Sequence, residues 1–161
     1  MLRNMALAVL ACLLCNGLIF ALGWQGSTDD AARQPGALAP PGWVIGTVWV
    51  GLFAAMGAAR ALLEQQMADG WLRDGRAALE ALRARRLLDL LLVNCLAYPA
   101  YTLGLSNRPL TLAGNALTIL LAVIVIRAAW PASRRAVALV APVIAWVSFA
   151  SVAVLRAAGV V

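Results

Sequence analysis

Five long apolar stretches divide the chain, at about residues 5–22, 43–63, 87–105, 110–130 and 136–158. A helix needs roughly 20 mainly apolar residues to cross the hydrocarbon core of a bilayer, and each stretch is close to that length. Lipid offers the backbone no hydrogen-bond partner, so an apolar segment crosses it as a helix. The pattern therefore predicts an all-α fold, a polytopic membrane protein built as a five-transmembrane-helix bundle.

The composition supports a membrane environment and a single domain. Of the 161 residues, 63% are hydrophobic and 12% are charged, whereas about a quarter of an ordinary soluble domain is charged. A small domain buries only about two-thirds of its surface on folding, so lipid must cover much of this one. We expect one membrane domain, residues 1–161, with a loop at 24–41 and a basic segment at 64–86.

The stretch 70–86 of the basic segment permits two interpretations. On a helix its leucines and its arginines fall on different faces, which is the pattern of an interfacial helix that rests on the lipid headgroups. Alternatively, the segment is an extension of the third membrane helix that protrudes from the bilayer. The residues favour neither interpretation over the other.

The first apolar stretch also permits two interpretations. Arg3 followed by an apolar run is compatible with a signal peptide. The run is long for that role, and no clear small-x-small cleavage site follows it. We therefore favour a helix that is retained in the bundle.

The arginines indicate an orientation. With five spans, the N-terminus shares a side with the second–third and the fourth–fifth connections, and that side holds ten arginines against three on the other. The ten are Arg3, Arg60, Arg73, Arg76, Arg83, Arg85, Arg86, Arg127, Arg134 and Arg135. The positive-inside rule then predicts a cytoplasmic N-terminus. We expect no nucleic-acid partner, because no soluble basic module surrounds these residues.

The reactive residue types exclude several kinds of chemistry. The chain has no His and no Lys, which removes His-ligated metal sites, His-based triads and Schiff-base lysines. Cys12, Cys15 and Cys95 lie within apolar stretches and are interpreted as buried small side chains. No carboxylate lies in mid-membrane, and Asp89, the nearest, is expected to pair with Arg85 or Arg86. We predict no metal, no catalytic residue and no required cofactor.

Polar and small residues inside the spans suggest contacts between helices. Asn94 needs a hydrogen-bond partner at its depth in the third span, and this partner is a neighbouring helix, a backbone carbonyl freed near Pro99, or a ligand. The small-xxx-small pairs Gly51/Ala55 and Ala100/Gly104 favour close helix contacts and are compatible with a homodimer.

A series of short motifs follows in a distinctive order. They are Pro40-Pro41-Gly42-Trp43, Trp49-x-x-x-Phe53, Met56 and Arg60, Asn94 with Pro99, Arg134-Arg135-Ala136, and Pro142-x-x-x-Trp146-x-x-Phe149-Ala150. This order resembles the TspO/MBR family, the tryptophan-rich sensory proteins of bacteria, which are related to the mitochondrial translocator protein. The chain departs from the family pattern at Ala37, Leu38, Ala97, Val143, Ala153 and Val154, and its second–third connection is longer. These departures bear on the ligand preference more than on the fold.

The resemblance implies an integral membrane protein of bacteria that binds a porphyrin or haem-type ligand, or another hydrophobic molecule, between its helices. It also implies a cap formed by the first loop, where Arg33 could meet a propionate, and a homodimer. The implied ligand-binding residues are Trp43, Trp49, Asn94, Trp146, Phe149 and Ala150. Light-driven porphyrin degradation, reported for some members, is not expected, because several of the family's Trp positions are replaced. The alternative is an accessory structural subunit of a larger membrane complex without ligand chemistry of its own.

Overall fold

The computed structural model describes residues 1–24, 38, 40–73, 75–105 and 107–157. The elements within these residues are α1 (Leu2–Ala21), α3 (Gly42–Arg73), α4 (Gly75–Pro99), the π-helical turn η1 (Ala100–Gly104), α5 (Arg108–Ala129) and α6 (Arg134–Ala157). Five helices in these ranges are long and apolar enough to cross a membrane. The predicted all-α bundle of five transmembrane helices is confirmed. Most of the predicted loop 24–41, with Arg33, lies outside the described residues.

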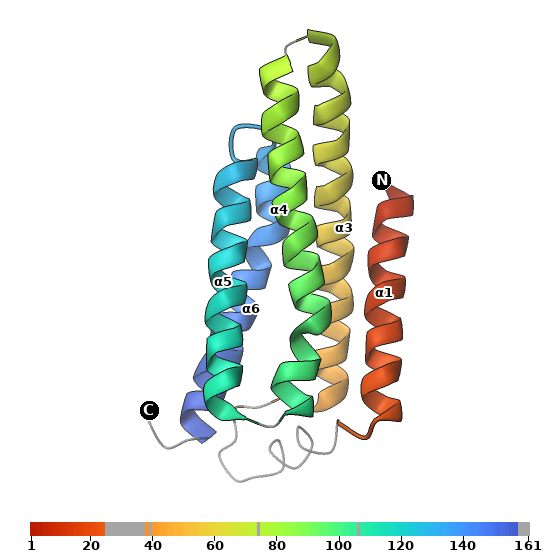
Figure 1. Cartoon of the computed structure of the whole chain (residues 1–161). Helices are drawn as coiled ribbons and strands as arrows, with labels where there is room; N and C mark the ends of the chain where they lie inside the picture. The colour runs from red at the N-terminus through yellow and green to blue at the C-terminus, as the bar shows by residue number, and fades with distance from the viewer. Residues whose placement is uncertain (25–37, 39, 74, 106, 158–161) are drawn as a thin grey trace.

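The helices form an antiparallel bundle around α3 (Figure 1). Helix α3 packs against α1, α4 and α6, and α5 completes the bundle between α4 and α6. Helix α1 lies on the outer side of α3 and has little contact with α4. The bundle thus has two ends, one with the N-terminus and the α3–α4 and α5–α6 connections, and one with the α1–α3 and α4–α5 connections. We call them the Arg-rich end and the loop end.

Helices α3 and α4 form a hairpin that extends beyond the other helices at the Arg-rich end (Figure 1). Helix α3 has 32 residues, about 48 Å at 1.5 Å per residue, which exceeds a hydrocarbon core of about 30 Å. The two helices approach closely there, because a Cβ atom on Gly70 would lie 2.7 Å from the backbone nitrogen of Ala78. The basic segment 64–86 is divided between the end of α3 and the start of α4, and its residues from Gly75 onward are continuous with α4.

Helix α1 docks on α3 through a backbone contact. A Cβ atom on Gly57 would come within 2.7 Å of the Asn4 carbonyl oxygen, so glycine is needed for this approach. Further along α1, Cys12 joins the common core with Cys95 and is 2% exposed. Cys12 and Cys95 thus pack as buried small side chains, as predicted, and Cys15 is half-buried.

Proline changes the end of α4. Pro99 has no N–H and its ring crowds the preceding turn, so the helix widens into the π-helical turn η1. The Thr102 hydroxyl donates a hydrogen bond to the Tyr98 carbonyl oxygen at 2.7 Å. The turn displaces the residues after Pro99 from a regular α-helical register and sets the direction of Tyr101.

Candidate functional site

The loop end of the bundle interior holds a group of uncharged polar and aromatic side chains. They come from α3, α4, η1, α5 and α6, and all lie within the membrane-spanning helices. We call this group the polar–aromatic layer; its members are Trp49, Asn94, Tyr98, Tyr101, Asn115, Thr118 and Ser151.

Hydrogen bonds join three helices across the layer. The Asn94 amide donates to the Thr118 hydroxyl at 2.8 Å. The Tyr98 hydroxyl donates to the side-chain oxygen of Asn115, whose amide nitrogen donates to the Ser151 hydroxyl at 2.9 Å. Asn115 is 1% exposed. Since lipid satisfies no polar group, these bonds fix α4, α5 and α6 relative to one another.

Aromatic rings line the same layer. The Tyr98 ring centroid lies 5.4 Å from that of Trp49 and 5.4 Å from that of Tyr101, which is within the range of favourable ring pairs. The Tyr101 hydroxyl is buried beside Asn94 and Thr118 but forms no well-aligned hydrogen bond with the described residues. The layer therefore offers ring faces together with a buried hydroxyl that has spare hydrogen-bonding capacity.

The residues implied by the family resemblance occupy three places. Trp49 and Asn94 lie in the layer, Trp49 being 9% exposed. Trp146 and Phe149 form a ring pair on α6, with centroids 5.7 Å apart, and Phe149 lies on the outer side of the bundle at 39% exposed. Trp43 stands at the start of α3 and is 74% exposed. Ala150 is partly buried on α6, one residue before Ser151 of the layer.

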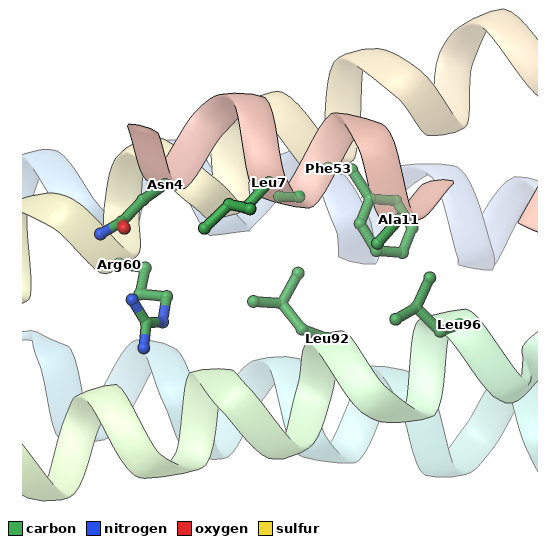
Figure 2. A pocket seen from close by; sticks show the side chains of 8 residues that line it. Asn4, Leu7, Ala11, Phe53, Arg60, Leu92 and Leu96 are labelled. Carbon is green, nitrogen blue, oxygen red and sulfur yellow. The ribbon is translucent and has the colours of Figure 1, made fainter. Parts of the chain in front are cut away.

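A lateral groove opens between α1, α3 and α4 (Figure 2). Its volume is about 250 Å³. Asn4 and Arg60 lie at one end of the groove, and apolar side chains such as Leu7, Leu92 and Leu96 line the rest. None of the six implied ligand-binding residues lines this groove.

An ionic cluster lies at the polar end of the groove. The Arg60 guanidinium contacts Glu64 Oε1 at 2.5 Å and Asp89 Oδ1 at 2.8 Å. Arg85 lies 3.5 Å from Glu64 and 3.7 Å from Asp89, and the Asn4 amide donates to Glu64 at 2.5 Å. The predicted Asp89–Arg85 pair is thus confirmed, but Arg60 of α3 is the closer partner. With two arginines and two carboxylates, the cluster is neutral and fastens α1, α3 and α4 together.

Sequence reasoning missed Asn115, Thr118 and Ser151 of the layer. Asn115 interrupts an apolar span in the same way as Asn94, so the same criterion would have found it. Thr118 and Ser151 also bond the carbonyl oxygen four residues earlier in their own helices, and a hydroxyl of this kind gives no distinctive sequence signal.

Comparison with known proteins gives a family match. The sequence model of the TspO/MBR family matches residues 8–158, nearly the whole chain. No curated protein and no solved structure gives a significant match.

Proposed function

The chain belongs to the TspO/MBR family, and on that premise we propose that it binds a flat hydrophobic ligand of the porphyrin type at the loop end of its helix bundle. As an integral membrane protein of this family, it is of the sensory and translocator type. The observation that supports ligand binding is the uncharged polar–aromatic layer in the membrane interior. Ring faces and buried hydrogen-bonding groups within an apolar environment are typical of small-molecule sites.

We place the ligand against the layer rather than in the lateral groove. The groove, at about 250 Å³, is below the range of roughly 300–1,000 Å³ that is common for ligand pockets. Trp49 and Asn94, which lie in the layer, are the first candidate contacts of the ligand, and Trp43 on α3 and Trp146, Phe149 and Ala150 on α6 are the further candidates. The layer residues carry no charge at neutral pH, which favours an uncharged, flat ligand core over an ion or a proton as the bound species.

Fluorescence titration of the purified full-length chain with protoporphyrin tests this proposal. Saturable quenching of tryptophan emission is expected, and Trp146→Ala and Trp49→Phe should each weaken it. Trp71→Phe is the matched control, because Trp71 lies on the α3–α4 hairpin, outside the proposed site, and is 59% exposed. No quenching, or quenching that only Trp71→Phe reduces, would contradict the assignment.

Orientation and oligomeric state are also part of the proposal. The Arg-rich end faces the cytoplasm, because arginines are retained on that side during insertion. A homodimer is supported by Gly51, whose position on α3 leaves open space around it. Gly104 gives no such support, because its backbone lies against the Trp24 ring, and a Cβ atom on Gly104 would come within 2.8 Å of that ring.

An accessory role in a larger membrane complex is the second candidate. It is favoured by the α3–α4 hairpin, where Trp71, Leu72 and Leu79 are 59%, 87% and 57% exposed. Exposed apolar groups outside the lipid core are typical of contact surfaces. Purification of the chain from its native membrane tests this role: a partner that is lost on replacement of Trp71 and Leu72 by Ser would support it, and a stable small homo-oligomer without any partner would count against it.

A further inference from the structure

A second groove lies between α4 and α5 at the Arg-rich end, far from the polar–aromatic layer. Its volume is about 390 Å³. Arg83 and Leu87 of α4 line one wall, and Ile124 and Arg127 of α5 line the other, with Pro131 at the outer end. We call it the α4–α5 groove.

The register between the two helices places the two arginines across from each other. Helices α4 and α5 are antiparallel, and Asn94 bonds Thr118. About two turns from this pair toward the Arg-rich end, Leu87 comes opposite Ile124, and a further turn brings Arg83 opposite Arg127. The register therefore puts the two cations at about the same level of the bundle, about three turns from the layer.

The charges of Arg83 and Arg127 are not compensated. Within the described part of the chain, neither side chain has a hydrogen bond or an ion pair. Glu80 also lines the groove, but Arg76 lies 3.5 Å from its carboxylate. Two like charges that face one groove repel each other, so a bound anion between them would be favourable.

The groove lies at the depth of the lipid headgroups. Arg127 is in the last turn of α5, about 29 Å along the helix from Arg108 at 1.5 Å per residue. That length matches the hydrocarbon thickness of about 30 Å. Leu87 and Ile124 are about one turn deeper than the two arginines, where acyl chains lie.

We propose that the α4–α5 groove binds an anionic phospholipid, with its phosphate between Arg83 and Arg127 and its acyl chains against Leu87 and Ile124. Apolar walls directly below the cations favour a lipid over a soluble phosphate, which has no apolar part to bury. This site is independent of the proposed porphyrin site, since the two share no residue and lie at opposite ends of the bundle.

Native mass spectrometry of the full-length chain in detergent tests the site, with titration of phosphatidylglycerol and phosphatidylcholine. The wild-type chain should prefer phosphatidylglycerol. Arg83→Gln/Arg127→Gln should weaken phosphatidylglycerol binding about 30-fold, as expected for the loss of two arginine contacts near a membrane surface. Arg3→Gln/Arg135→Gln removes the same charge from the same end without altering the groove, and should retain the preference.

Three results would overturn the proposal. Equal loss in both double variants would mean that net charge alone attracts the lipid. No loss in the groove variant would place the lipid elsewhere, and displacement of the lipid by millimolar inorganic phosphate would identify a phosphate site instead. If the groove double variant does not fold, the single variant Arg127→Gln, compared with Arg135→Gln, should show the weaker binding on its own.

Discussion

The ring of Tyr101 lies directly against the backbone of Gly114, and a Cβ atom placed on Gly114 would come within 2.1 Å of the ring carbon Cε2. The contact joins η1 to α5 and is possible only because residue 114 has no side chain. Tyr101 also packs edge-on against Tyr98. The glycine thus holds the aromatic part of the polar–aromatic layer in position.

Replacement of Gly114 by Ala should therefore destabilise the protein by about 1–3 kcal/mol, the usual cost of an overpacked contact. Thermal unfolding of the purified chain, followed by circular dichroism, measures the loss. Because the clash requires the ring, Tyr101→Ala in the Gly114→Ala background should recover part of the stability, as is typical of coupled sites.

Gly17→Ala is the control for this prediction. Gly17 is also within a membrane helix, α1, but no atom of another helix lies within 4 Å of its Cβ position. The substitution should leave the stability unchanged or raise it slightly, because alanine is the better helix former. Equal losses from Gly17→Ala and Gly114→Ala would show that the Tyr101 contact is not the cause.

The number of membrane helices could be predicted from the sequence because lipid dictates it: each apolar stretch has only one way to satisfy its backbone. The ends of α3 and α4 at the hairpin could not be predicted from the sequence in this way. The apolar-run criterion finds where a helix leaves the hydrocarbon, whereas strong helix formers such as Glu64 and Leu79 continue the helices well beyond that point.

The site could be predicted only in part. Asn94 was identified because a lone amide in an apolar span needs a partner, but its partner Thr118 comes from α5, and spacing within one helix gives no information about the neighbour. The same limit applies to Asp89. Its partner Arg85 follows from the i, i+4 spacing, whereas Arg60 becomes visible only when α3 packs against α4.

The ionic cluster leads to a second prediction, on Arg60→Gln. Loss of this cation leaves Glu64 and Asp89 with Arg85 alone, so the stability should fall by about 1–2 kcal/mol, below the value for fully buried pairs because the groups are partly exposed. The double variant Arg60→Gln/Asp89→Asn should lose less than the sum of the two single variants. Thermal unfolding of the wild type, the two single variants and the double variant gives the four stabilities of this double-mutant cycle.

Arg76→Gln is the matched control for the cluster. Arg76 is also paired at i, i+4, with Glu80, but its side chain is 86% exposed. The substitution should change the stability by less than about 0.5 kcal/mol. A loss of stability as large as that of Arg60→Gln would mean that an exposed arginine pair at this end contributes as much to the stability as the ionic cluster. The link that the cluster makes between α1, α3 and α4 would then not explain the effect of Arg60→Gln.

Asn115→Ala is the third prediction. The substitution leaves the Tyr98 hydroxyl without its acceptor and Ser151 without its donor, and should cost about 1–2 kcal/mol. Protoporphyrin quenching should weaken as well, because the layer loses its link to α6. Asn16→Ala is the control, since the hydrogen bond that Asn16 makes among the described residues is a long one to the Cys12 sulfur, at 3.9 Å, and it should change neither property appreciably. If folded Asn115→Ala shows unchanged quenching, the ligand does not bind at the polar–aromatic layer.

The last prediction concerns the direction of the bundle in the membrane. Gly75 at the tip of the α3–α4 hairpin has open space around it, and Arg108 at the loop end is exposed. The Arg108→Cys variant should react with a membrane-impermeant maleimide in intact cells, and the Gly75→Cys variant only after permeabilisation. The native Cys12 and Cys95 are buried and Cys15 is half-buried within α1, so the wild-type chain should give little background. The reverse pattern would place the Arg-rich end outside, and the ten arginines there would then have failed to retain that end in the cytoplasm.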